Sequence, residues 1–301
     1  MSGAPSRPTA SLPEVRVALV TDSTAYLPAA LVAAAPVPIT VVPLHVVLDG
    51  HEYAEGVDIT AEELAVALRR HRRVSTSRPS PQTFLGAYRA AAQTGATAIV
   101  SVHLSGAMSG TWESATLAAQ QSPVPVEVVD SRTLGMAMGY AVLSAGEAAS
   151  LGTDAKTVAA IALSRSTRAT VLLYVDTMEH LRRGGRIGSA SALLGLALAI
   201  KPILQVRDGS IAPVERVRTA GRALARMTEI AVSAAAEAVM SGGVDMAVQH
   251  LDAAERAEAL ADQLRARVTG ADRVVVAELG AVVGAHVGPG AIAVAVSPRP
   301  C

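Results

Sequence analysis

Short β-branched segments alternate with helix-start signals through the first half of the chain, and this alternation restricts the fold more than any other feature. Strands separated by helices imply parallel crossover connections, and therefore a layered α/β/α domain with a mainly parallel sheet. The predicted strands are Val15–Val20, Ala98–Val102 and Val126–Val129, with a second apolar stretch at Ile39–Leu48. Helices are predicted over 61–72, 81–95, 110–121, 132–150 and 154–168.

Three of these helices carry recognisable start signals. Thr60 and Glu63 have the spacing of a capping box. Ser80 precedes Pro81, and proline is favoured at the first helical position. Ser109 can cap the helix that begins at 110.

The second half of the chain predicts a different architecture. Asp208-Gly209 separates two apolar segments and is a two-residue hairpin signal. A hairpin among separated strands and helices indicates an α+β domain with a mixed or antiparallel sheet. We therefore expect a disordered tail at 1–14, an N-terminal α/β domain at 15–169 and a C-terminal α+β domain at 170–301.

The composition excludes several classes of protein. Hydrophobic residues make up 50% of the chain and charged residues 17%, which excludes wholesale disorder. The 26 basic and 26 acidic residues balance, so nothing favours nucleic acid or an anionic membrane. The lone Cys301 allows no internal disulfide. The longest apolar run, Ala192–Ile200, is too short to span a membrane. Residues 1–13 lack the apolar core of a signal peptide. We expect a soluble cytoplasmic protein without stable membrane insertion, with transient membrane contact left open.

Ligands of parallel α/β sheets bind beyond the carboxyl ends of the strands. The loops at 21–24, 103–109 and 130–133 each follow a predicted strand and are expected to meet along one edge. Asp22 and Asp130 end two of these strands and could titrate, but nothing in the sequence pairs them with a partner.

Two segments of small, hydroxyl-bearing residues precede predicted helices. Thr76–Ser80 places hydroxyls and backbone N–H groups just before a helix start, where anions are attracted. Ser105–Thr111 follows a strand, and its small residues would let a ligand approach the backbone. Helix capping by Ser80 or Ser109 is the alternative interpretation of both segments.

Two further segments contain groups that could meet an anion. Leu181–Gly188 has three arginines and three glycines, which suit a phosphate or a partner surface, although a solvated basic loop is the alternative. Gly284–Gly290 carries His286 among small residues, where it could act as an acid, a base or a satisfied core histidine. No Walker motif, dinucleotide fingerprint or metal-ligand spacing is present, so we expect no cofactor and no metal site. These groups predict a protein that binds an anion, with hydrolase activity left open.

Seven short motifs, in order along the chain, resemble those of the DegV family of bacterial fatty-acid-binding proteins. Each motif alone is weak, but together they span nearly the whole chain. They are Val20–Pro28, Thr76–Ser80, Ser105–Thr111, Asp130–Ser131, Arg183–Ile187, Lys201–Leu204 and Gly284–Gly290.

The resemblance implies one long-chain fatty acid in an apolar tunnel between the two domains. It implies that the carboxylate meets Thr76, Ser109 and His286. The neighbours implied for these three are Ser77, Ser105 and Gly110.

The resemblance also implies a carrier without catalysis of its own, namely the binding subunit of a fatty acid kinase. Such a subunit presents the carboxylate to a separate ATP-using kinase subunit and then carries the acyl phosphate toward phospholipid synthesis. Arg183 and Arg186 are the implied contacts to the kinase or the phosphate. Two alternatives remain: a serine esterase or thioesterase, and a regulatory lipid sensor with another protein partner. The esterase would use Ser109 or Ser105 with His286.

Overall fold

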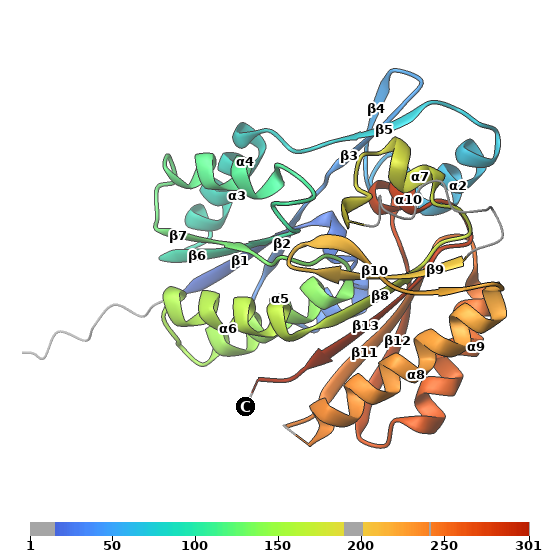
Figure 1. Ribbon diagram of the computed structural model, residues 1–301. Coiled ribbons are helices and arrows are strands. Elements are labelled where there is room, and N and C mark those ends of the chain that lie inside the picture. Colours follow the sequence, from blue (N-terminus) through green and yellow to red (C-terminus); the bar gives the residue numbers. More distant parts are fainter. Residues whose placement is uncertain (1–15, 190–200, 241, 301) are drawn as a thin grey trace, which may run out of the picture.

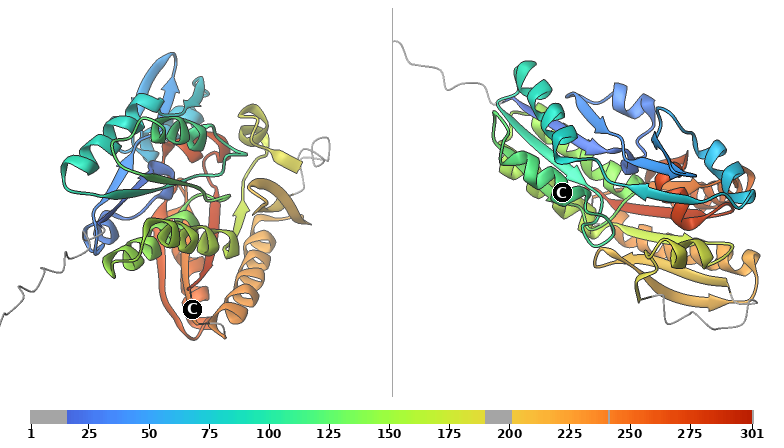
Figure 2. Two further views of the ribbon diagram at one scale, coloured as in Figure 1. Left: turned by 90° about the vertical axis from the view of Figure 1, so that its left-hand side faces the viewer. Right: turned by 90° about the horizontal axis from the view of Figure 1, so that it is seen from above.

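The computed structural model describes residues 16–189, 201–240 and 242–300. The predicted tail, the apolar run at 192–200 and Cys301 lie outside the described residues. Two large sheets and a small one are layered with helices (Figures 1 and 2), which confirms the two-domain α/β fold class.

A four-stranded parallel sheet forms the centre of the N-terminal domain. Its strands are β1 (Val17–Asp22), β2 (Ile39–Val42), β6 (Ala98–His103) and β7 (Val126–Asp130), in the order β2-β1-β6-β7. All neighbouring pairs are parallel, as the predicted crossovers require. Helices α3 (Pro81–Gln93) and α4 (Thr111–Ala119) cover one face, and α5 (Met136–Ser150) and α6 (Ala155–Arg168) cover the other (Figure 1). The short elements η1 (Ser23–Ala25) and α1 (Ala29–Ala33) follow β1.

A three-stranded antiparallel sheet was not predicted. It consists of β3 (His45–Leu48), β4 (His51–Ala54) and β5 (Val74–Ser77), in the order β4-β3-β5, with α2 (Ala61–Arg69) between β4 and β5. The predicted apolar stretch Ile39–Leu48 is divided around Pro43, since proline has no N–H to continue a strand ladder. Thr76 and Ser77 therefore lie on a strand and not in a loop before a helix.

Two of the predicted helix starts are confirmed. The Thr60 hydroxyl accepts a hydrogen bond from the Glu63 N–H at 3.1 Å, and the Glu63 carboxylate accepts one from the Thr60 N–H at 2.8 Å. The Ser80 hydroxyl accepts from the Thr83 N–H at 3.2 Å. These local contacts fix where α2 and α3 begin.

Two other predicted helix starts are wrong. Gly110, and not Ser109, is the N-cap residue of α4. Helix α5 begins at Met136 and not at 132, because Arg132 (φ 53°) and Gly135 (φ 66°) adopt positive φ values that a right-handed helix excludes. The loop before α5 is consequently longer than predicted.

A six-stranded mixed sheet forms the C-terminal domain. Its strands are β8 (Thr170–Tyr174), β9 (Lys201–Arg207), β10 (Ser210–Val217), β11 (Val244–His250), β12 (Ala271–Glu278) and β13 (Ile292–Pro298). The order is β10-β9-β8-β13-β11-β12, and only β11 and β12 pair in parallel. The predicted hairpin is confirmed, with Asp208 (φ 50°) and Gly209 (φ 78°) in the left-handed region that a type I′ turn requires.

The two faces of the mixed sheet have different neighbours. Helices α8 (Ala220–Val239) and α9 (Ala254–Arg267) cover one face (Figure 1). The other face is turned toward α5, α7 (Glu179–Arg183) and α10 (Ala281–Val287). One hydrophobic cluster joins this face to the parallel sheet, since it contains Leu19 and Val100 as well as Leu173 and Ala293. The two domains therefore share a core.

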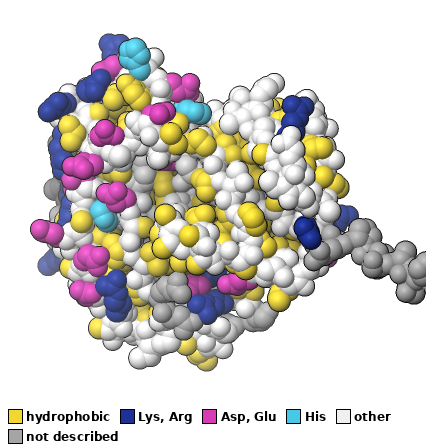
Figure 3. All heavy atoms as spheres, turned by 180° about the vertical axis from the view of Figure 1, so that it is seen from behind, with side chains coloured by type: hydrophobic (Ala, Val, Ile, Leu, Met, Phe, Trp, Pro, Cys, Tyr) yellow, Lys and Arg dark blue, Asp and Glu magenta, His cyan; other side chains and the backbone are white. Residues whose placement is uncertain are grey.

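Charges of both signs are mixed on the surface. Charged side chains gather along one side of the face in Figure 3, and its centre is mostly uncharged. This agrees with a net charge of zero. In the part of the chain that the structure describes, no helix has both the length and the apolar character needed to cross a membrane.

Candidate functional site

A cavity of about 420 Å³ lies between the mixed sheet, the β6–α4 loop and the three-stranded sheet. This volume falls within the ~300–1,000 Å³ of small-molecule sites. The face of the mixed sheet forms an apolar floor, from Val171, Leu173, Val206, Ile211 and Ala293. Helices α7 and α10 add further apolar side chains. The cavity therefore suits a ligand with a long apolar body.

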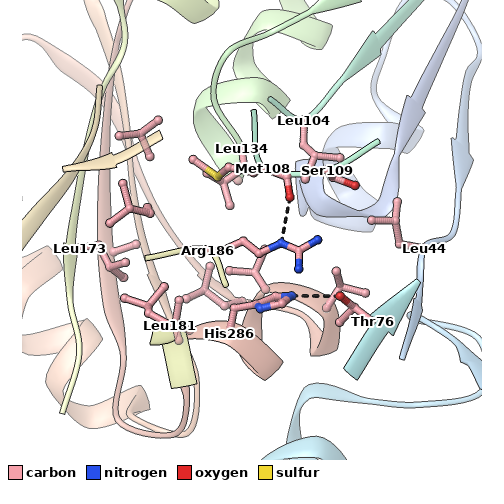
Figure 4. Close-up of a pocket in the computed structure, with 18 of the residues that line it drawn as sticks. Leu44, Thr76, Leu104, Met108, Ser109, Leu134, Leu173, Leu181, Arg186 and His286 are labelled. Atoms are coloured by element: carbon pink, nitrogen blue, oxygen red, sulfur yellow. Dashed lines mark hydrogen bonds between the residues drawn. The ribbon is translucent and has the colours of Figure 1, made fainter. Parts of the chain in front are cut away.

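Polar side chains occupy the side of the cavity opposite the mixed sheet (Figure 4). Thr76 comes from β5, Ser109 and Gly110 from the turn before α4, and His286 from α10. Segments far apart in the sequence thus bring together the three side chains that the resemblance assigned to one carboxylate. Arg186, which follows α7, points toward them.

His286 is a neutral hydrogen-bonding group. Its Nε2 lies 2.9 Å from the Thr76 hydroxyl, while its Nδ1 is buried without a partner among the described residues. Burial, and then the charge of Arg186, lower the pKa of His286 to about 4. In the tautomer with its proton on Nε2, the N–H donates to Thr76 and Nδ1 carries no hydrogen that would need an acceptor.

We expect the depressed pKa of His286 to make folding depend on pH. The unfolded histidine has a pKa near 6.5, so below that pH the unfolded chain binds more protons than the folded one. The stabilising contribution is complete above pH 6.5 and is lost as the pH falls toward 4, by about 2–3 kcal/mol. Urea unfolding of wild type and His286→Gln across this interval measures it, and the difference between the proteins isolates His286 from other histidines. Parallel pH profiles would show that His286 is not buried as described.

The glycines of the two motifs bring α7 and α10 together. A Cβ on Gly184 would lie 2.1 Å from His286 Nδ1, and a Cβ on Gly288 would lie 2.2 Å from His180 Cδ2. Either side chain would push the helices apart and move His286. Close packing between the two segments thus explains Gly184 and Gly288.

Two guanidinium groups border the polar side of the cavity. Arg186 is exposed, and its Nε donates to the Met108 carbonyl at 3.0 Å. Arg78 lies across Gly110, where a Cβ would be 1.6 Å from its Nη1, and forms an ion pair with Glu113 at 3.2 Å. Nothing in the sequence marked Arg78 as a separate site residue. Both arginines favour an anionic group at this side.

Three residues named from the sequence are engaged elsewhere. The buried Ser105 hydroxyl donates to the Gly209 carbonyl at 2.7 Å, outside the cavity lining. Arg183 is exposed and forms an ion pair within its own helix, also outside the lining. Ser77 lines the cavity, but its hydroxyl donates to Glu52.

The loops after β1, β6 and β7 meet along one edge of the parallel sheet, as predicted. Asp22 accepts from the Leu104 N–H at 3.0 Å, and Asp130 accepts from the Gly106 N–H at 3.1 Å. Leu104 belongs to the cavity wall. The carboxylates therefore fix the loop that carries Ser109.

Behind this loop lies a buried Asp–His–Ser chain that the sequence did not reveal. His103 Nδ1 lies 3.0 Å from Asp22, and its Nε2 lies 2.7 Å from the Ser101 hydroxyl. The order resembles a hydrolase triad. All three side chains are completely buried and Ser101 also accepts from Tyr88, so the chain serves as a structural anchor.

A second buried acid holds the start of α10. Glu55 accepts from the Val282 N–H at 2.7 Å, and the Tyr26 hydroxyl, which donates to Glu55, accepts from the Val283 N–H at 3.1 Å. Burial raises the pKa of Glu55 and, together with the Glu55 charge, that of Tyr26. These contacts position the helix that carries His286. Glu55 was not singled out from the sequence, and Tyr26 was only part of the Val20–Pro28 motif, because their partners on α10 are more than 200 residues away.

The candidate nucleophiles are not paired with histidine. The Ser109 hydroxyl lies 2.9 Å from that of Thr111, whereas His286 is bonded to Thr76. Among the described residues, no group of three or more His, Cys, Asp or Glu side chains could hold a metal ion. The described contacts are those of a binding site and give the esterase alternative no support.

Comparison with known proteins agrees with the resemblance. The family model described as "Uncharacterised protein, DegV family" matches residues 16–299. A DegV domain-containing protein of Streptomyces coelicolor is 50% identical over 283 residues, which are 94% of this chain and 99% of the relative. Two solved structures superpose closely on this one, and each match covers 100% of the solved chain. A DegV family protein of Thermus thermophilus, described as fatty acid binding, has a TM-score of 0.87 at 34% identity over 94% of this chain. Bacillus subtilis DegV, described as a fatty acid binding protein, has a TM-score of 0.86 at 28% identity over 95%.

Proposed function

Because this chain belongs to the DegV family, we propose that it binds one long-chain fatty acid in the cavity between its two domains. The acyl chain lies over the apolar floor of the mixed sheet, and the carboxylate meets Thr76, Ser109 and His286. The observation that carries the proposal is an apolar cavity with a hydroxyl–imidazole pair on one side. The fatty acids of the Thermus and Bacillus relatives give the ligand class.

The energetics of the cavity fit this ligand. About 14 buried methylenes supply ~11 kcal/mol before ordering costs. An unpaired buried carboxylate would cost several kcal/mol, so its partners decide whether binding is tight. If His286 Nε2 donates to Thr76, the Thr76 hydroxyl is free to donate to the carboxylate, and Arg78 and Arg186 supply positive charge nearby.

We also propose that the protein presents the carboxylate to a separate ATP-using kinase subunit in the cytoplasm and carries the acyl phosphate, with no catalysis of its own. Arg186 is both exposed and part of the cavity lining, so it can meet a phosphate formed there. Arg183 is exposed at the end of α7, outside the lining, and suits a contact with the kinase. A partner recovered with the protein that phosphorylates no fatty acid would contradict this step and favour a lipid sensor.

The ligand itself is tested by native mass spectrometry of freshly purified protein, followed by denaturation and identification of the released lipid. We expect one bound C14–C18 fatty acid per chain. An empty protein that also refuses added stearate would overturn the proposed function. Hydrolysis of acyl esters by the pure protein would instead support the esterase.

Thr76→Val removes the hydroxyl and keeps the shape of the side chain. We expect fatty acid binding to weaken about 10-fold or more, because a hydrogen bond to a charged group is lost. Titration with stearate measures the change. Ser75→Ala, one residue earlier on the exposed face of β5, is the matched control and should bind as wild type does. Equal binding by Thr76→Val would remove Thr76 from the carboxylate site.

A further inference from the structure

The apolar floor of the cavity contains one polar side chain among the lining residues that the mixed sheet contributes. Gln249 on β11 pairs in register with Ala293 on β13, which in turn pairs with Leu173 on β8. All three line the cavity. Gln249 is only 2% exposed, so its amide is removed from bulk water.

The orientation of this amide is fixed by the backbone. Gln249 Oε1 accepts from the Met136 N–H, at the start of α5, at 2.9 Å. The close approach depends on Gly135, since a Cβ there would lie 2.6 Å from Oε1. A main-chain N–H can only donate, so the oxygen must face Met136 and the NH₂ group must face elsewhere.

The NH₂ group of Gln249 is the unsatisfied part of this amide. Its Nε2 is buried and has no hydrogen-bond partner among the described residues. The oxygen of the amide caps α5, whereas the nitrogen is a donor without an acceptor beside an otherwise apolar floor. Buried donors are nearly always paired, and an unpaired one opposes any ligand that cannot accept from it.

Building on the proposed function, we propose that Gln249 recognises an oxygen atom on the acyl chain, so that the protein prefers an oxo or hydroxy fatty acid to a plain saturated one. A saturated chain offers Nε2 no acceptor, so the donor stays unpaired. A chain oxygen placed against Nε2 would accept its hydrogen bond. Gln249 would thus recognise a polar group on the acyl chain that is separate from the carboxylate proposed to meet Thr76 and His286.

The test is a positional series of C18 acids titrated into delipidated wild-type protein: stearate, and oxostearates with the oxo group at successive chain positions. The matching hydroxystearates separate the two oxygen sources. We expect one position, or two adjacent ones, to bind about 10-fold tighter than stearate, because one buried hydrogen bond is made instead of left open. Equal affinity for stearate and every oxygenated isomer would overturn the inference. A preference for cis-octadecenoic acids without one for oxygenated acids would overturn it also, and would assign Nε2 to a double bond.

Two variants locate the effect at the amide. Gln249→Glu keeps an acceptor for the Met136 N–H and has no donor while its carboxyl is ionised, so the preference should disappear at a pH above the pKa of that carboxyl. Gln249→Met removes both groups and should bind stearate at least as well as the oxo acid. A preference that survives in both variants would place recognition elsewhere. If the wild-type protein binds neither stearate nor any other acid, the proposed function itself fails. Equal affinity for all acids would contradict only the role of Gln249 and leave the proposed function intact.

Discussion

Ala293→Phe is expected to weaken binding of C18 fatty acids by about 100-fold or more. Ala293 lies in the middle of the apolar floor, 7% exposed, where a phenyl ring would extend into the cavity. Each methylene that is kept out costs ~0.8 kcal/mol, so exclusion of about four of them costs ~3 kcal/mol, which corresponds to this factor. The ring fills existing space, so the protein should still fold. Titration with stearate and a thermal midpoint measure the two quantities.

Shorter acids distinguish a shortened cavity from a damaged protein. If the ring blocks one part of the cavity, C8–C12 acids should lose far less affinity in Ala293→Phe than stearate does. Thr76→Val should show no such recovery, because its defect is at the carboxylate. Ala30→Phe, on the exposed α1, adds the same bulk away from the cavity and should bind as wild type does. Unchanged stearate binding by Ala293→Phe would mean that the acyl chain does not lie over the mixed sheet.

The parts of the fold that follow from local signals were predictable from the sequence. The capping box at Thr60, the Ser80 cap and the Asp208-Gly209 turn each involve neighbouring residues, and the structure has all three. The three-stranded sheet was missed, because β4 and β5 have four residues each and are stabilised by pairing with β3 and not by their own pattern. The start of α5 was missed because the backbone of Arg132 and Gly135 depends on contacts made elsewhere.

The candidate site was predictable in its polar part and not in its apolar part. Thr76, Ser109 and His286 were assigned together by the resemblance to the DegV motifs, whereas their spacing alone left helix capping and a core histidine as alternatives. The floor uses Val, Leu, Ile and Ala, which also fill every other part of the core, so nothing marked them. The residues that position the site act through long-range contacts that no spacing rule encodes: Glu55 holds the start of α10, and Asp22 holds the β6–α4 loop.

Arg165 fixes the two domains against each other, and nothing in the sequence predicted this role. From α6 it donates to Ser144 on α5, to Ser297 on β13 at 3.0 Å, and to Asp245 on β11. Its guanidinium also lies over the Tyr140 ring, 5.4 Å from the centroid. One side chain, 4% exposed, therefore joins the helices of the parallel sheet to the mixed sheet.

Arg165→Met is expected to lower the free energy of unfolding by about 3–5 kcal/mol, since breaking a buried ion pair leaves its partner uncompensated. Burial raises the pKa of Asp245, but hydrogen bonds from Arg299 and Arg165 outweigh it and hold that pKa below its usual value. Arg299 still pairs with Asp245 in the variant, so the loss of unfolding free energy should be nearer to about 3 than to about 5 kcal/mol. Urea unfolding at pH 7 gives the value.

Arg168→Met is the matched control, because Arg168 ends the same helix and is exposed, so its loss should change stability by no more than about 0.5 kcal/mol. Arg165→Lys keeps the charge but lacks the planar fork that reaches three partners, and should fall between wild type and Arg165→Met. Since the cavity lies between the domains that Arg165 joins, we also expect Arg165→Met to weaken stearate binding at a temperature where it is still folded. A loss of less than about 1 kcal/mol, with binding unchanged, would show that the shared core alone fixes the domains and that Arg165 adds nothing to it.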